Sequence, residues 1–361
     1  MKLDILAEEQ LKLELIRVLS KFFLKHIEEL VRNQAGAFFP VEKIESLKLG
    51  KRLGRRKELQ LMTVSVVDSL QNRKFDVSLA FKFLSDTESA IREGNGAMWL
   101  GEILKNNFKV KTPQLLYFSH ENSLLIYEGL TGPQELFDNE LDEPQKLYLA
   151  GMALPYIHGV FQHKVQVDRY LHLITNVLER LHYSPGEKEE LNSLFKPFLR
   201  RIGLNNSGAN SFGDYHPGNV MLLETEEKTS DTGDLRIDTT TVYLIDPAYV
   251  DREGNIDRAE DLGTFFSKFA YNDFFLTQSF DKTVEDFEML CKGYDYTISQ
   301  NGIMLNDYYP EGTTFDFQIA LGILLDGLFK VKISGFEKSK NRIQTSFNAV
   351  KYILRKKPFE I

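Results

Sequence analysis

Two short segments contain the residues whose types and spacing could do chemistry. The first is Phe212-Gly213-Asp214-Tyr215-His216-Pro217-Gly218-Asn219, in which an Asn follows an Asp after five residues and directly precedes an apolar run. The second is Leu244-Ile245-Asp246-Pro247, in which an Asp ends another apolar run. Taken alone, the first segment could be an ordinary polar turn. Together they match a phosphoryl-transfer set, in which one Asp takes a proton from the attacking hydroxyl while an Asn and a second Asp hold metal. We predict Asp214 as that base and Asn219 and Asp246 as ligands of Mg²⁺, which prefers oxygen donors.

The segment 212–219 resembles the His-Gly-Asp-x-His-x-x-Asn signature of the aminoglycoside phosphotransferase and choline kinase-like enzymes, which are small-molecule relatives of the protein kinases. The family's first His is Phe212 here, at a position that usually supports the loop. This departure weakens the subfamily assignment more than the reaction. The resemblance covers roughly residues 45 to 330 and implies an α+β, two-lobed protein-kinase-like fold. It also implies that His216 supports the loop and that Asp261 bonds its backbone, although Asp261 could simply cap a helix.

Composition limits the other classes of function. The chain has 361 residues and a net charge of −8, which argues against a general nucleic-acid binder. No run of eighteen apolar residues occurs, so we expect no membrane span. The start, Met1-Lys2-Leu3-Asp4, lacks the apolar core of a signal peptide. The single Cys291 excludes an intramolecular disulfide and is typical of a reducing compartment, so we expect a cytoplasmic protein.

Hydrophobic periodicity predicts three parts: a helical extension over 1–40, a small antiparallel sheet within 41–128 and a mostly helical part over 129–361. The family resemblance implies that 41–128 is the N-lobe, which binds nucleotide, and that 129–361 is the C-lobe with the catalytic loop and acceptor-substrate helices. Residues 4–33 read as one long amphipathic helix with mixed charges on its polar face. We expect that helix either to pack across the nucleotide lobe or to pair with a second copy in a dimer. Its apolar positions are Leu11, Leu15, Leu19, Phe22, Phe23, Ile27, Leu30 and Val31.

Segments 44–49, 58–67 and 75–84 read as three antiparallel strands. The basic connection 49–57 contains Gly50, Lys51 and Gly54, which could bring backbone and charge close to the phosphates of ATP. It matches neither the P-loop nor the complete dinucleotide-binding motif, so a hairpin tip without a ligand is the alternative.

Lys82 is the one cation in the apolar run 78–84, and a charge placed there needs a partner. In kinases such a Lys contacts the α- and β-phosphates and is oriented by a Glu of the next helix. We expect that helix to begin near Asp86 and choose Glu93 as the partner, with Glu88 and Glu102 left open. An exposed edge Lys with a buried stem is the alternative.

Two further strands, 113–118 and 123–127, lead to a segment rich in Gly, Pro and acidic residues. In the family this segment is the hinge, which implies that backbone groups near Glu128 and Leu130 bind the adenine edge. We expect a helix over 145–162, in which His158 resembles a family His and is a core or loop-supporting residue. A second helix should open at Ser184-Pro185, and the polar stretch 225–240 should be an insertion between two strands.

Acidic residues outnumber basic ones over 251–330, and several aromatic residues accompany them. Together they could hold an amine-bearing substrate through charge and cation–π contact. A solvated helical surface would explain the same charges. The aromatic residues are Tyr294, Tyr296, Tyr308, Tyr309 and Phe315.

The sequence therefore predicts a small-molecule kinase that uses ATP and Mg²⁺ and moves the γ-phosphoryl group to a hydroxyl of an amine-bearing or sugar-like metabolite. One alternative is a protein or lipid-like acceptor, because His216-Pro217-Gly218-Asn219 also resembles the atypical kinases linked to quinone synthesis. Their Lys-x-Gly-Gln signature is absent, which argues against it. The other alternative is a nucleotide-binding pseudokinase that docks partners through 4–33 and has no need of Asp214.

Overall fold

The computed structural model describes residues 41–53, 59–68, 74–130, 132–159, 164–204, 208–224, 239–300 and 314–359. The chain divides into two compact units, Met1–Glu102 with Thr112–Pro133 and Ile103–Lys111 with Gln134–Ile361. The predicted helix 4–33, Gly54, most of the insertion 225–240, and Tyr308 and Tyr309 lie outside the described residues. None of the described helices is long and apolar enough to cross a membrane.

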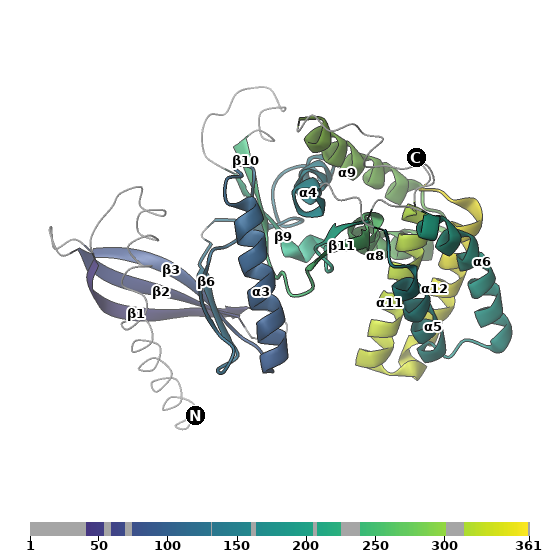
Figure 1. Cartoon of the computed structure of the whole chain (residues 1–361), viewed down its shortest axis with the longest axis horizontal. Helices are drawn as coiled ribbons and strands as arrows, with labels where there is room; N and C mark the ends of the chain where they lie inside the picture. The colour runs from purple at the N-terminus through teal and green to yellow at the C-terminus, as the bar shows by residue number, and fades with distance from the viewer. Residues whose placement is uncertain are drawn as a thin grey trace. The chain divides into compact units, whose positions relative to one another are not determined.

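The first unit is built on a five-stranded antiparallel sheet in the order β1-β2-β3-β6-β5 (Figure 1). Its strands are β1 (Val41–Leu53), β2 (Leu59–Asp68), β3 (Lys74–Phe83), β5 (Leu115–Ser119) and β6 (Leu124–Glu128). The three predicted N-terminal strands are confirmed. However, β1 is longer than predicted, so Gly50 and Lys51 belong to the strand rather than to the connection. They lie where the register with β2 shifts, between Leu49 and Arg52, and at such a bulge one strand has an extra unpaired residue while the pairing continues beyond it.

Helix α3 (Thr87–Leu104) covers one face of this sheet. Asp86 precedes the helix, and its Oδ1 accepts the N–H of Ser89 at 2.7 Å, as a capping Asp does. Ala90 and Ala97 of the helix belong to one buried cluster with Ala80, Leu125 and Tyr127 of the strands. The helix continues through Gly94 although glycine has a low helix propensity. A Cβ at this position would lie 2.9 Å from the Phe118 ring, so glycine lets the helix pack closely against the sheet. Packing of the small residue against the sheet therefore overrides local propensity.

The second unit is mainly helical. A Cβ on Gly151 would lie 1.9 Å from the carbonyl oxygen of Leu290, and one on Gly293 would lie 1.9 Å from that of Tyr148, so these two glycines let α4 and α9 approach closely. The predicted start at Ser184-Pro185 is confirmed, because Ser184 and Glu187 form a capping box with bonds of 2.7 to 3.4 Å. The described helices are α4 (Glu143–His158), α5 (Val167–Arg180), α6 (Pro185–Leu204), α8 (Ala259–Thr277), α9 (Asp281–Gln300), α11 (Phe315–Ser334) and α12 (Phe336–Lys356).

Short strands in the second unit position the two sequence motifs. One sheet has the order β4 (Val110–Lys111), β10 (Thr240–Leu244), β9 (Val220–Glu224) and β7 (Gln134–Glu135), and a second pairs β8 (Gly208–Ser211) with β11 (Asp251–Asp257). In the antiparallel β9–β10 pair, Leu244 lies opposite Val220. This register brings the end of segment 212–219 beside the end of β10. The α+β class, with an antiparallel-sheet unit and a mainly helical unit, is confirmed.

Candidate active site

The loop that contains Asp214 closes on itself. It enters the 3₁₀ helix η1 (Pro217–Asn219), for which His216 is the N-cap residue: its Nδ1 accepts the N–H of Gly218 at 3.0 Å. The amide of Asn219 donates through Nδ2 to the backbone oxygen of Asp214 at 3.0 Å, and its N–H donates to the backbone oxygen of His216 at 2.8 Å. Asp214 and Asn219, five residues apart, are thus held together by the loop's own hydrogen bonds.

Asp246 reaches the same place from the neighbouring strand. The N–H of Ile245 donates to the backbone oxygen of Asn219 at 3.0 Å, which continues the β9–β10 pairing by one step. Asp246 follows with φ of 60°, a left-handed conformation that costs most side chains about 1–2 kcal/mol but that Asp tolerates better than most. Strained backbone of this kind occurs preferentially at functional sites.

The carboxyl of Asp214 is partly exposed and electrostatically perturbed. Burial raises the pKa of Asp214 above its ordinary value, the charge of His216 opposes that change, and the charges of Asp246 and Asp261 add to it. The side chain is still 42% exposed, and its Oδ2 lies 3.8 Å from Nε2 of His216. A carboxylate with a raised pKa that a ligand can reach is suited to accept a proton.

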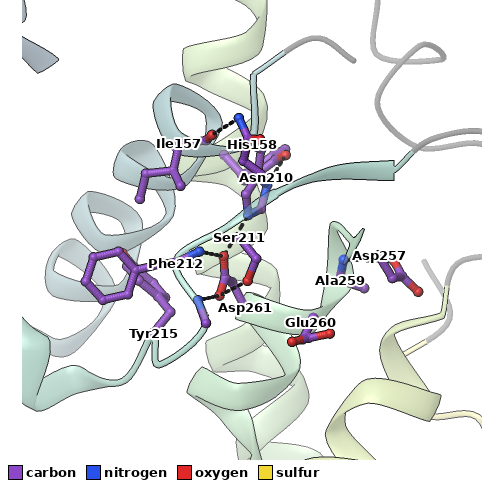
Figure 2. A network of polar contacts seen from close by, with 12 residues as sticks. Ile157, His158, Asn210, Ser211, Phe212, Tyr215, Asp257, Ala259, Glu260 and Asp261 are labelled. Carbon is purple, nitrogen blue, oxygen red and sulfur yellow. Dashed lines mark hydrogen bonds and ion pairs between the residues drawn. The ribbon is translucent and has the colours of Figure 1, made fainter. Parts of the chain in front are cut away.

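Asp261, in the first turn of α8, anchors the backbone that precedes Asp214 (Figure 2). Its Oδ2 accepts the N–H of Phe212 at 2.7 Å, and its Oδ1 accepts the N–H of Gly213 at 2.9 Å and the hydroxyl of Ser211 at 3.0 Å. Gly213 has φ of +79°, and a Cβ there would lie 2.2 Å from the carbonyl oxygen of Tyr249, so the position requires glycine. These are the backbone bonds that the family resemblance implied for Asp261; Ser211 was not anticipated, because nothing in its local sequence distinguishes it.

His158 connects Asp261 to a third helix. Its Nε2 lies 3.1 Å from Oδ2 of Asp261 and its Nδ1 lies 2.8 Å from the hydroxyl of Tyr294, on α9. The side chains of His158, Asp261 and Tyr294 are all buried, so His158 supports the loop from the protein interior through Asp261. The interpretation of Tyr294 and Phe315 as substrate contacts is wrong, because they are only 1% and 2% exposed and belong to the core.

Phe212 stands where the signature that this segment resembles has a His. Its ring is fully buried and packs edge-to-face on Tyr215, at 5.8 Å between centroids. The hydroxyl of Tyr215 donates to the backbone oxygen of Ala150 at 2.6 Å. Apolar packing therefore holds a position that the family fills with His.

In the first unit, Lys82 has the partner that its buried position requires. Its Nζ lies 2.8 Å from Oε2 of Glu93, and the two side chains are 9% and 2% exposed. Tyr127 donates to the other carboxylate oxygen, Oε1, at 2.9 Å. Of the three candidate Glu residues, Glu93 is thus the one in this ion pair. Tyr127 was not anticipated from the sequence.

The predicted hinge residues end the sheet. Glu128 is the last residue of β6, and its N–H donates to the backbone oxygen of Gln114 at 2.9 Å. Gly129 donates to the backbone oxygen of Ser78 at 2.8 Å, and a Cβ on it would lie 2.5 Å from the Ser78 backbone. The N–H groups of Glu128 and Gly129 are thus used within the sheet. Binding of the adenine edge by backbone groups near Glu128 and Leu130 stays a prediction.

The donor set of Asn219 and Asp246 fits a hard cation. Because Nδ2 of Asn219 donates to the Asp214 carbonyl, its Oδ1 is the end of the amide available as a ligand. Within the part of the chain that the structure describes, no group of three or more His, Cys, Asp or Glu residues could hold a metal. A cation on Asn219 and Asp246 would therefore need phosphate oxygens and water to complete its shell, which is how Mg²⁺ is commonly bound.

Comparison with known proteins gives similarity to solved structures only. No protein-family model matches the sequence, and no curated protein is significantly similar to it. The choline kinase LicA from Streptococcus pneumoniae is 14% identical and aligns over 90% of this chain and 98% of its own, with a TM-score of 0.46. A choline/ethanolamine kinase family protein from Mesorhizobium loti is 14% identical over 84% of this chain and 92% of its own, with a TM-score of 0.44. The aminoglycoside phosphotransferase APH(2")-IIa, in its gentamicin complex, is 13% identical over 90% of this chain and 97% of its own, with a TM-score of 0.47.

Proposed function

We propose that the protein transfers the γ-phosphoryl group of ATP to a hydroxyl group of a small molecule. The observation that carries the proposal is the assembly of Asp214, Asn219 and Asp246 by hydrogen bonds of a single loop and hairpin. A polar turn needs no such assembly, and the backbone of this loop is in addition fixed by the buried Asp261. An acid–base and cation-binding site explains why these acidic side chains are kept close despite their mutual repulsion.

In the proposed reaction, Asp214 orients the acceptor hydroxyl and takes its proton. The hydroxyl oxygen bonds to the γ-phosphorus, the bond from that phosphorus to the β–γ bridging oxygen breaks, and ADP leaves with the bonding electrons. The raised pKa of Asp214 makes its carboxylate a stronger base than an ordinary Asp.

Asn219 and Asp246 would hold Mg²⁺, which when bound neutralises the charge of the phosphates. In the first unit, Lys82 would bind phosphate oxygens, and Glu93 and Tyr127 would keep its ammonium in position. The buried pair is suited to this task because Lys82 already has the bond that fixes its direction before any ligand binds.

The experiment is a transfer assay with γ-³²P-labelled ATP and Mg²⁺. Wild type, Asp214→Asn and a control are incubated with pooled hydroxyl metabolites, including amino alcohols, sugars and aminoglycosides, and separately with proteins and lipid-like alcohols. The control is Asp168→Asn, which removes an exposed carboxylate in the first turn of α5. We expect label in a metabolite with wild type and the control only. Label confined to proteins or lipids would change the acceptor class, and ATP binding without transfer to any pool would contradict the proposal.

A further inference from the structure

His216 has a fixed ring orientation in the loop that carries Asp214. Its backbone is extended, with φ of −137° and ψ of 161°, and its Nδ1 accepts the N–H of Gly218 at 3.0 Å. The ring also lies directly on Gly218, because a Cβ there would be 3.0 Å from Cε1 and 3.2 Å from Nδ1 of His216. Gly218 therefore holds the ring both through its N–H and by having no side chain.

The bond to Gly218 decides which ring nitrogen carries the proton. A ring nitrogen that accepts an N–H has no proton of its own, so the neutral ring of His216 carries its proton on Nε2. Nε2 is then a hydrogen-bond donor with a fixed direction. Support of the loop uses Nδ1 and does not require this second nitrogen.

The donor lies beside the carboxylate of Asp214. Nε2 of His216 is 3.8 Å from Oδ2 of Asp214, and the two side chains are 44% and 42% exposed, so a ligand can reach both. This separation is too long for a direct hydrogen bond, which has about 2.7 to 3.2 Å between its heavy atoms. A single oxygen atom can lie at hydrogen-bond distance from both atoms and bridge them.

An acceptor hydroxyl is the group that suits this place. A hydroxyl has one hydrogen to donate and two lone pairs that can accept. Its hydrogen would go to Oδ2 of Asp214, and one lone pair would accept the N–H of His216. The other lone pair then stays available for the phosphorus. A phosphate oxygen suits the place less well, because it has no hydrogen to donate and its charge would meet the like charge of Asp214.

We propose that His216 is a second residue that binds the acceptor hydroxyl, and that it does so through the hydrogen on Nε2. The inference rests on the proposed function. In the reaction the hydroxyl proton passes to Asp214, the oxygen bonds to the γ-phosphorus, and ADP leaves with the electrons of the broken bond. His216 keeps its own proton throughout. Its role is to fix the acceptor oxygen in the direction of attack before transfer.

Two substitutions separate the donor from the support of the loop. His216→Asn places an amide oxygen where Nδ1 lies, so it can keep the bond to Gly218 as a capping Asn does, but it has no group at the position of Nε2. His216→Gln places an amide nitrogen near the position of Nε2 and gives up the bond to Gly218. We expect His216→Gln to hydrolyse ATP about tenfold faster in kcat than His216→Asn. His216→Asn should nevertheless melt at the higher temperature.

A residue that only supports the loop would give rates in the same order as the melting temperatures. Equal rates of the two variants, or a faster His216→Asn, would therefore overturn the proposal. The same two substitutions at His172, an exposed residue of α5, are the controls and should match wild type. An inactive wild type would instead refute the proposed function, and this inference with it.

Nucleotide binding distinguishes the acceptor from the phosphate as the partner of His216. The affinities of His216→Asn for ADP and for the non-hydrolysable analogue β,γ-imido-ATP are measured by calorimetry with Mg²⁺. We expect both to equal the wild-type values, because the proposal places no phosphate on His216. A loss of affinity for the analogue, with or without a loss for ADP, would assign His216 to nucleotide binding and overturn the proposal.

Discussion

Replacement of Asp261 by Asn should loosen the loop that carries Asp214. The carboxylate is 1% exposed and accepts two backbone N–H groups, the Ser211 hydroxyl and a bond with His158. An Asn side chain can place its oxygen toward only one of the two backbone N–H groups, so the other loses its acceptor at a cost of about 1–3 kcal/mol. The remaining bonds change from charge-assisted to neutral, which costs about another 1–2 kcal/mol.

The expected total is roughly 3 kcal/mol or more. For a unit of this size, 1 kcal/mol corresponds to about 2–4 °C, so the melting temperature should fall by about 10 °C. Displacement of Asp214 by an ångström should also reduce ATP hydrolysis by about 10²-fold. Calorimetric melting and steady-state hydrolysis measure both, with Asp168→Asn as the exposed control. If Asp261→Asn melts with the control and hydrolyses ATP at the wild-type rate, Asp261 does not hold the loop.

Three further substitutions have separate outcomes. Asp246→Asn keeps a residue type that tolerates the left-handed backbone, so it should melt normally but lose Mg²⁺-dependent nucleotide affinity; unchanged calorimetric titrations would remove Asp246 as a ligand. Lys82→Met keeps the buried stem but removes the cation from the buried Glu93 carboxylate, so it should lose most activity and also melt lower than wild type; retention of more than about a tenth of the activity would contradict a phosphate role. Burial raises the pKa of Glu260 to about 7 from 4.5, so its contribution to stability is full below pH 4.5 and is lost as the pH rises through 7. Denaturant titrations should therefore give a lower free energy of unfolding at pH 8 than at pH 5. In Glu260→Gln this difference between the two pH values should be smaller by up to about 3 kcal/mol.

The strands and the catalytic motifs could be predicted because their signals are local. Alternating residues mark β2, and the spacing of Asp214 and Asn219 is set within one loop. Asp246 could be found because a carboxylate at the end of a buried run is costly without a purpose. These predictions needed no knowledge of what packs against each segment.

The rest depended on contacts between distant parts of the chain. Tyr127 donates to Glu93 across 34 positions, and no pattern near either residue signals it. Tyr294 looks like an aromatic substrate contact in the sequence, yet it is buried against His158, 136 positions away. The passage of α3 through Gly94 likewise depends on Phe118, a residue of another element.

The central claim is that Asp214 is the base of a phosphotransferase, and Asp214→Asn tests it most directly. The variant keeps the size and shape of the side chain, so Mg-nucleotide affinity measured by calorimetry should stay at the wild-type value. Hydrolysis of ATP, with water as the acceptor, should fall by about 10²- to 10⁴-fold in kcat. If the wild-type protein hydrolyses ATP and Asp214→Asn does so equally well, the base lies elsewhere and the assignment of the site is wrong.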